Sequence, residues 1–206
     1  MITGPLSADS LGLLHRALLF WQQQGFVFVD LPWIIPGHFT RMTRPPERRE
    51  ISTFYGNLVA SGEQSFLKLF QNKRLVAAPG YVGWSPCFRD EPWFDELHQF
   101  AFIKAECFVP FQHRIAGKIA LSQLLSKQQQ LFISLAKLHG SKAPIIEQEV
   151  VKHDQIDLCL GGIEIGSYGV REFEGCQYLY GTALALPRFT TALDRAAGTP
   201  ATSVPW

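Results

Sequence analysis

The sequence predicts an α+β fold, an antiparallel β-sheet flanked by helices, in a single domain over residues 1–206. Two observations predict it. Apolar side chains recur at helical spacing in two long segments. Short segments rich in β-branched and aromatic residues, separated by glycine turns, cluster on either side of the second one. A chain of 206 residues also has the length of one domain with a sizeable core.

The first predicted element is an amphipathic helix over residues 8–24, followed by a strand over residues 26–30. Its apolar face is formed by residues at helical spacing: Leu11, Leu14, Leu18 and Trp21. Gly25 is a residue type that commonly ends a helix. The following Phe-Val-Phe-Val run has β propensity, and Pro32 then interrupts the strand.

Residues 37–57 are expected to form a loop region with a basic run: Arg41, Arg44, Arg48 and Arg49. Such a run is most often a solvated loop, and the alternative is a contact with a phosphate or an acidic partner. Residues 58–79 are expected to hold short strands. Glu63 and Gln64 lie on a turn between them, where Gln64 could hydrogen-bond an α-ammonium or a side chain, or could simply be a turn residue.

Residues 83–109 predict a β-hairpin with nucleotide-binding chemistry. Arg89 carries a planar, permanent charge that suits a phosphate. The carboxylate of Glu91, two residues later, points to the same strand face. Phe102 on the aromatic return strand can stack on a base. The ordinary alternatives are a cross-strand ion pair between Arg89 and Glu91 and core packing of Phe102.

The second half of the chain predicts a long amphipathic helix, three strands and a short helix. The long helix runs from His113 to Leu138 and is closed by Gly140. The later elements are expected at residues 156–160, 163–171, 177–185 and about 187–196. The tail from Gly198 to Trp206 is expected to be loose.

Two carboxylates, Asp157 and Glu164, flank the pair Gly161 and Gly162. That spacing suits two adjacent strands joined by a tight turn, which brings both side chains to one site. Hard oxygen ligands of this kind can hold Mg²⁺ that bridges triphosphate oxygens. The alternative is a pair of carboxylates at a hairpin edge.

These segments together resemble the catalytic core of class II aminoacyl-tRNA synthetases, over roughly residues 8 to 195. The segment at about 11–36 resembles motif 1, a helix, a glycine, a strand and a proline. The segment at about 83–109 resembles motif 2, written Arg-x-Glu, a variable loop, then His-x-x-x-Phe. The residues that match motif 2 are Arg89, Glu91, His98 and Phe102.

The segment at about 178–195 resembles motif 3, written Gly-x-Gly-x-Gly-x-x-Arg. Gly181 and Arg188 are in register, whereas Ala183 and Ala185 replace two glycines. Asp157 and Glu164, followed by Arg171, are similar to the aspartyl and asparaginyl branch and to its asparagine-synthetase paralogues. The small residues of motif 3 are expected to let the strand approach the nucleotide.

The resemblance implies ATP-dependent activation of an amino acid or similar carboxylate as an acyl adenylate, with ATP and Mg²⁺ as cofactors. Arg89 and Arg188 are the implied catalytic residues. The implied ATP-binding residues are Arg89, Glu91, His98, Phe102, Arg171 and Arg188. The implied substrate-binding residues are Glu63, Gln64, Glu106 and Ser167. Asp157 and Glu164 are the implied Mg²⁺ ligands.

Motif 1, with the helix at 8–24 and Pro32, implies a homodimer, and the low charged share of 18% agrees with an apolar surface left for a partner. A net charge of +1 does not support tRNA binding, because nucleic-acid-binding domains are usually strongly basic. No apolar leader or membrane span is evident, and four cysteines without a CxxC pair suggest a reduced, cytoplasmic protein and argue against zinc.

Three functions stay open. The first is a free-standing synthetase-like enzyme with an unknown acyl acceptor, since the chain starts at motif 1 without an anticodon-binding barrel. The second is a catalytically silent paralogue that binds an amino acid or nucleotide and regulates a partner. The third is a tRNA-handling accessory protein, supported by the arginine loop alone.

Overall fold

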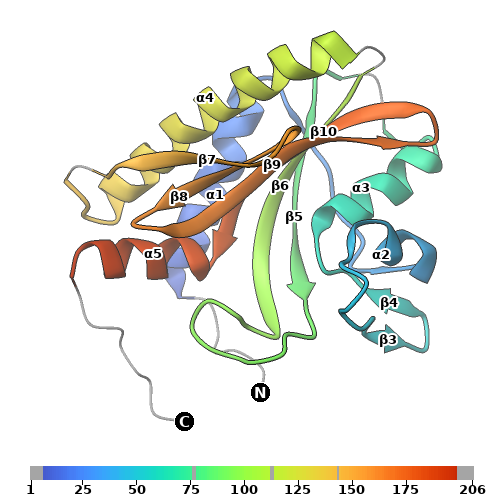
Figure 1. Cartoon of the computed structure of the whole chain (residues 1–206), viewed down its shortest axis with the longest axis horizontal. Helices are drawn as coiled ribbons and strands as arrows, with labels where there is room; N and C mark the ends of the chain where they lie inside the picture. The colour runs from blue at the N-terminus through green and yellow to red at the C-terminus, as the bar shows by residue number, and fades with distance from the viewer. Residues whose placement is uncertain (1–6, 76–77, 112–113, 143, 199–206) are drawn as a thin grey trace.

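The computed structural model describes residues 7–75, 78–111, 114–142 and 144–198. Its centre is a seven-stranded sheet in the order β1-β5-β6-β10-β9-β8-β7 (Figure 1). The strands are β1 (Val27–Phe28), β5 (Tyr81–Phe88), β6 (Ala101–Phe111), β7 (Ile146–Lys152), β8 (Gln155–Leu160), β9 (Ile163–Phe173) and β10 (Cys176–Leu186). β1 runs parallel to β5, and the other neighbours pair antiparallel.

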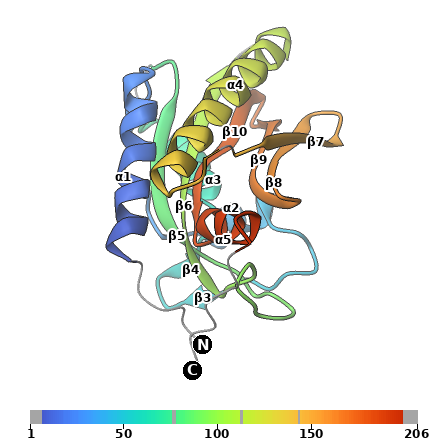
Figure 2. The same cartoon turned by 90° about the vertical axis from the view of Figure 1, so that its left-hand side faces the viewer.

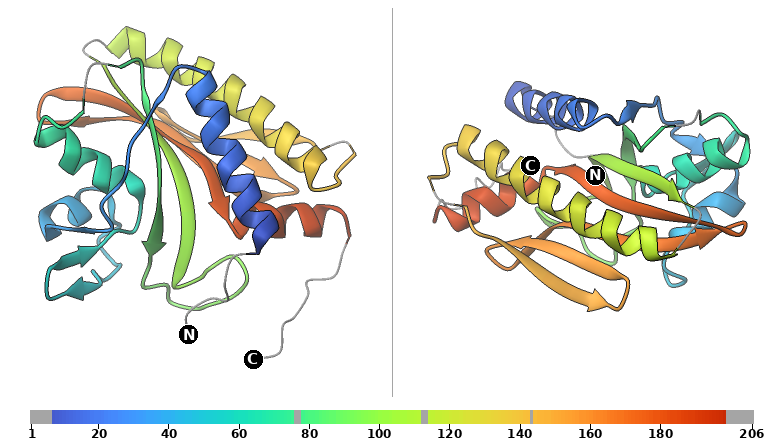
Figure 3. Two further views of the ribbon diagram at one scale, coloured as in Figure 1. Left: turned by 180° about the vertical axis from the view of Figure 1, so that it is seen from behind. Right: turned by 90° about the horizontal axis from the view of Figure 1, so that it is seen from above.

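Helices and a small second sheet cover this sheet. The helices are α1 (Ala8–Gln23), α2 (Gly37–Thr43), α3 (Gly62–Gln71), α4 (Arg114–Leu138) and α5 (Arg188–Ala196). The small sheet has the order β2-β4-β3, with β2 (Ile34–Ile35), β3 (Ser52–Thr53) and β4 (Gly56–Leu58). α1 and α4 lie side by side across one face of the large sheet (Figure 3).

The two faces of the sheet have separate cores. Behind the sheet, apolar residues of α1, α4 and α5 pack on β6, β9 and β10. α5 lies near the C-terminal half of α4 (Figure 2), where the rings of Phe132 and Phe189 stack at 5.2 Å. On the other face a smaller core joins α2 and α3 to one end of β6 and β10. The remainder of that second face is available for polar side chains.

The structure confirms the predicted α+β class and most of the predicted elements. The helix expected at 8–24 is α1, the hairpin expected at 83–109 is β5 and β6, and the last three strands and the last helix are β8, β9, β10 and α5. The tight turn also forms, since Gly161 and Gly162 have φ values of 58° and 76°, which favour glycine. The long helix is described from Arg114, so its expected first residue, His113, lies outside the described residues, as does the tail after Gly198.

Three expectations need correction. Residues 62–71 form α3 and not a turn between strands, because the Ser61 hydroxyl caps the helix by accepting the Glu63 N–H at 3.2 Å. Glu63 and Gln64 therefore lie on the first turn of a helix. The region 37–57 is not all loop, since it contains α2 and the β3–β4 hairpin, and the edge strand β7 was not predicted.

None of the helices in the described part of the chain combines the length and the apolar character that a membrane span needs.

A buried polar bridge joins the helical layer to the sheet. The Trp21 indole N–H donates to the side-chain oxygen of Gln128 at 3.2 Å, and the Gln128 amide donates to the Ala183 carbonyl at 2.9 Å. Trp21, Gln128 and Ala183 are all fully buried. Gln128 thus provides the hydrogen-bond partner of one buried polar group on α1 and of one on β10.

Replacing Gln128 with leucine should lower the free energy of unfolding by about 2–4 kcal/mol, because it leaves two buried polar groups without partners. Gln130→Leu, on an exposed position of the same helix, is the matched control and should change stability little. Urea denaturation followed by circular dichroism measures both. Equal stabilities of the two variants would contradict the role given to Gln128.

Candidate functional site

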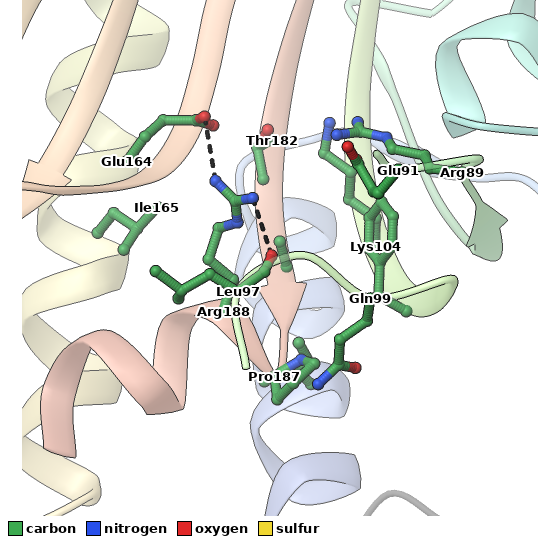
Figure 4. A pocket seen from close by; sticks show the side chains of 13 residues that line it. Arg89, Glu91, Leu97, Gln99, Lys104, Glu164, Ile165, Thr182, Pro187 and Arg188 are labelled. Carbon is green, nitrogen blue, oxygen red and sulfur yellow. Dashed lines mark hydrogen bonds and ion pairs between the residues drawn. The ribbon is translucent and has the colours of Figure 1, made fainter. Parts of the chain in front are cut away.

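A cavity opens on the polar face of the sheet, beside the loop that joins β5 to β6. It is lined from the end of β5, from β6, from β9 and β10, and from the first residue of α5. Its charged lining residues are Arg89, Glu91, Lys104, Glu164 and Arg188. Figure 4 shows Arg188 between Glu164 and Leu97, with Lys104, Glu91 and Arg89 across the cavity. The site therefore presents three cations and two carboxylates.

Arg89 follows the last residue of β5 and reaches two neighbours. Its Nε–H donates to the Ala60 carbonyl at 3.4 Å. Its guanidinium lies over the Phe102 ring, 4.9 Å from the centroid. Glu91 instead pairs with Arg48 at 3.0 Å, so Arg89 and Glu91 do not form the cross-strand ion pair that was the alternative. The charge of Arg89 is thus available in the cavity.

Arg188, at the start of α5, crosses the cavity. One guanidinium nitrogen donates to Glu164 at 3.3 Å and another to the Leu97 carbonyl at 3.0 Å. The free volume is about 50 Å³, well below the roughly 300–1,000 Å³ usual for small-molecule pockets. The cavity in this arrangement is therefore smaller than a nucleotide.

Lys104 is a cation that sequence reasoning missed. It lies two residues after Phe102 on β6, so both side chains share one strand face. Its ammonium donates to Glu106 at 2.8 Å. The alternation along the return strand of the hairpin was the signal that could have identified it.

Glu106 is buried at 3% exposure and is surrounded by donors. It accepts the Ser61 hydroxyl at 2.7 Å, the Gly62 N–H and the Lys104 ammonium. The paired position on β10 is Thr182, which lines the cavity. Glu106 therefore connects the start of α3 to Lys104, which lines the cavity.

Two other predicted substrate-binding residues are held by internal contacts. The Gln64 amide donates to the Thr40 carbonyl and the Thr43 hydroxyl, both at 3.0 Å, and its oxygen accepts the Ala60 N–H at 2.9 Å. Ser167 accepts the Gln155 amide at 3.1 Å. These contacts leave Gln64 as a support for the loop before α3.

Glu63 pairs with Arg171 at the far side of α3. Both Glu63 oxygens accept from one nitrogen of Arg171, at 2.7 and 2.8 Å, and the Tyr178 hydroxyl donates to Glu63 at 2.9 Å. Burial raises the pKa of Glu63, and the Arg171 charge opposes this. Arg171 also stacks on Tyr180 at 4.2 Å. The structure therefore does not bring Arg171 or Glu63 to the cavity.

His98 also lies outside the cavity lining. Its ring nitrogen Nδ1 is 2.9 Å from the Asp95 carboxylate, and its ring makes an edge contact with Trp93 at 5.4 Å. It belongs to the β5–β6 loop, which also carries the Leu97 carbonyl that accepts from Arg188. A contact between His98 and a nucleotide stays a prediction.

Asp157 and Glu164 lie on the neighbouring strands β8 and β9, as the glycine pair between them predicted. Asp157 pairs with Ser167 and Glu164 with Cys159 in the strand register. Burial raises the pKa of Asp157, and the charge of Glu164 adds to this. One Asp157 oxygen, Oδ1, is buried without a hydrogen-bond partner. No group of three or more metal-ligating side chains occurs within the described ranges.

The small residues of the motif 3 segment do not all face the cavity. A side chain at Gly181 would collide with Tyr168, 2.6 Å away, and with Leu124 of α4. Ala183 is buried in the core behind the sheet, whereas Ala185 lines the cavity. The small size of Gly181 and Ala183 therefore serves packing behind the sheet, and only Ala185 departs from the motif next to the candidate site.

A comparison of the sequence with descriptions of protein families gives no match, and neither does a comparison with curated proteins. Solved structures do match the fold. Seryl-tRNA synthetase from Pyrococcus horikoshii complexed with ATP has a TM-score of 0.70 and 19% identity, over 88% of this chain and 49% of that one. Pyrrolysyl-tRNA synthetase from Desulfitobacterium hafniense has a TM-score of 0.67 and 19% identity, over 93% and 70%.

Cytoplasmic serine-tRNA ligase from Naegleria fowleri, in complex with AMP, has a TM-score of 0.67 and 15% identity, over 93% of this chain and 52% of that one. This chain thus spans about half the length of the two seryl enzymes. The fold is that of class II aminoacyl-tRNA synthetase catalytic cores. These likenesses do not support a special closeness to the aspartyl and asparaginyl branch.

Asp157→Asn should stabilise the protein in a pH-dependent way. A raised pKa means that the folded state disfavours the ionised carboxyl. This cost is absent below the pKa of an unfolded aspartate, about 3.9, and grows as the pH rises past it. The variant should therefore be more stable than the parent at pH 8 and equal to it near pH 4.

Urea denaturation at both pH values tests this, with the exposed Asp30→Asn as the matched control. A stabilisation by Asp157→Asn that is the same at both pH values, or a loss of stability at pH 8, would contradict it.

Proposed function

We propose that the protein binds ATP in this cavity and uses it to activate an amino acid or similar carboxylate as an acyl adenylate. The observation that carries the proposal is the convergence of Arg89, Lys104 and Arg188 on one cavity that also contains Phe102. These residues come from both strands of a hairpin and from a helix at the other end of the chain. Three cations beside an aromatic ring suit a triphosphate attached to a base.

The reaction consists mainly of positioning and charge neutralisation. A carboxylate oxygen of the substrate attacks the α-phosphorus, the bond to the bridging oxygen of the β-phosphate breaks, and pyrophosphate leaves with that electron pair. The attacking carboxylate is already ionised, so no general base is needed. Arg89 neutralises the charge that develops on the α-phosphate, and Arg188 holds the far end of a bent triphosphate, which lies back toward the adenine.

Phe102 and Arg188 would hold the adenine between them, since a flat guanidinium and a ring can both stack on a base. Arg188 must first leave Glu164 and the Leu97 carbonyl. ATP binding and movement of the β5–β6 loop are therefore coupled. Lys104 lies between Arg89 and the buried Glu106, where its charge serves the phosphate or the attacking carboxylate.

Asp157 and Glu164 suit Mg²⁺ in the way this ion usually binds with nucleotides, through one or two carboxylates together with phosphate oxygens. The unpartnered Oδ1 of Asp157 and the position of Glu164 beside Arg188 fit that arrangement. The ion would supply further neutralisation of phosphate charge. Electron paramagnetic resonance of Mn²⁺ tests this, because ATP should increase Mn²⁺ binding by the parent protein and not by Asp157→Asn.

A homodimer through motif 1 fits the exposed apolar residues around β1 and β2: Val27, Phe28, Trp33 and Ile34. Two monomers that associate through β1 and β2 would bury these side chains. Analytical ultracentrifugation tests the proposal, and a monomer at all accessible concentrations would refute it.

The test of the proposed reaction is ATP–pyrophosphate exchange with each of the twenty amino acids. Exchange should depend on one amino acid or a few, and Arg89→Ala should reduce it by about 100-fold or more, as expected for a lost transition-state contact. Arg74→Ala, an exposed arginine outside the cavity, should leave it unchanged.

ATP binding without any exchange would favour the second candidate, a silent paralogue that binds a nucleotide. The contacts that hold Arg188 across the cavity favour it, and so does Ala185, which lines the cavity in place of a motif 3 glycine.

A further inference from the structure

A second cavity adjoins the first, and its lining includes four arginines. It has a volume of about 240 Å³ and lies between residues 43–49, the loop before α3 at residues 60–64, and the end of β5. Its charged lining residues are Arg44, Arg48, Arg49, Arg89, Asp90 and Glu91. Arg89 and Glu91 also line the first cavity, so the two are contiguous. We call it the arginine cavity.

Carboxylates within the arginine cavity neutralise only part of its positive charge. Arg48 pairs closely with Glu91 at 3.0 Å; the Glu91 side chain is 9% exposed and the Arg48 side chain is 32% exposed. Arg49 is 4.0 Å from Asp90 and is 89% exposed, so that contact contributes little. The cavity thus keeps an excess of positive charge, carried by Arg44, Arg49 and Arg89.

Arg44 has few partners for a half-buried guanidinium. Its Nη1 donates a long hydrogen bond to the Pro45 carbonyl, at 3.4 Å. Its Nε is buried without a hydrogen-bond partner. Its charge is felt at a distance by Glu50, whose pKa is lowered chiefly by the Thr40 hydroxyl and further by Arg41 and Arg44. A buried polar group without a partner is costly, and an anionic ligand would relieve that cost.

The geometry points to a binding site for an anionic group, a carboxylate or a phosphate monoester, that belongs to a reactant other than ATP. This inference rests on the proposed function. Arg188 and Lys104 lie in the first cavity only, so the triphosphate tail is directed there. The arginine cavity adjoins Arg89, the residue assigned to the α-phosphate, so in the proposed reaction we place the attacking carboxylate on this side of the α-phosphate.

Two molecules approach from that side: the amino acid that is activated, and the acceptor that later takes the acyl group. An acidic side chain of the first or a phosphate of the second carries the same chemistry. Arginine binds either group through two parallel N–H bonds. In this proposal, the arginines at residues 44–49 of the basic run bind an anion and are not only part of a solvated loop.

The experiment is calorimetric titration of inorganic phosphate into the full chain, with and without a saturating non-hydrolysable ATP analogue. Phosphate should bind in both conditions. Arg44→Gln/Arg49→Gln should weaken phosphate binding at least tenfold and leave binding of the ATP analogue unchanged. Arg16→Gln/Arg74→Gln removes the same charge from exposed positions outside the cavity and should bind phosphate as the parent does.

Arg49→Gln alone, at a highly exposed position, should fold normally and weaken phosphate binding by a smaller factor. Phosphate binding that the ATP analogue abolishes would overturn the inference, since the cavity would then hold ATP's own phosphates. Equal weakening by both double variants would also overturn it, because it would show an effect of net charge alone. Failure of the ATP analogue to bind would refute the proposed function without affecting the phosphate titration.

Kinetics of the same variants distinguish the two possible sources of the anion, the amino acid and the acceptor. If the group is an amino-acid side chain, Arg44→Gln/Arg49→Gln should raise the KM for an acidic amino acid in pyrophosphate exchange by at least tenfold. If it belongs to the acceptor, exchange should be unchanged and phosphate should compete with the acceptor in acyl transfer. No phosphate binding by the parent protein would contradict both.

Discussion

The buried carboxylate of Glu106 joins the parts of the candidate site. It receives hydrogen bonds from Lys104 on its own strand and from Ser61 and Gly62 at the start of α3. A buried charge costs several kcal/mol unless it is paired and hydrogen-bonded. The donors are therefore held close to the Glu106 carboxylate. Ala60, the residue before Ser61, accepts from Arg89. One carboxylate thus contacts both Lys104 and the start of α3, and Arg89 contacts the residue before that start.

The sheet keeps this polar network apart from the main core. Alternate residues on β6 and β10 face opposite sides, so Phe102, Lys104 and Glu106 lie on one face while Ala105 and Cys107 lie in the core behind. Burial raises the pKa of Cys87 to about 12 and raises that of Cys107 as well, which leaves both thiols inert at neutral pH. The chemistry of the site is that of its arginines, lysine and carboxylates.

Local patterns predicted the elements whose signals are local. The helical spacing of α1, the Gly161–Gly162 turn and the hairpin of β5 and β6 depend on residues close together in sequence, and they form as predicted. Contacts between distant segments were not predictable in this way. Glu63 and Arg171 are 108 residues apart, and their pairing removes both from the cavity. The helix α3 was missed because a single Ser cap before a mixed polar and apolar run resembles a turn. Lys104 was missed because it lines the same cavity as Arg188, which belongs to a distant segment of the chain.

The central claim is that the cavity beside Arg188 binds ATP once the β5–β6 loop moves. Isothermal titration of ATP into the parent protein and into Lys104→Met measures this directly. The account predicts saturable binding of one ATP per chain, weakened at least tenfold by Lys104→Met, which removes a cation and keeps a side chain of similar length. A folded parent protein that binds no ATP would contradict the account.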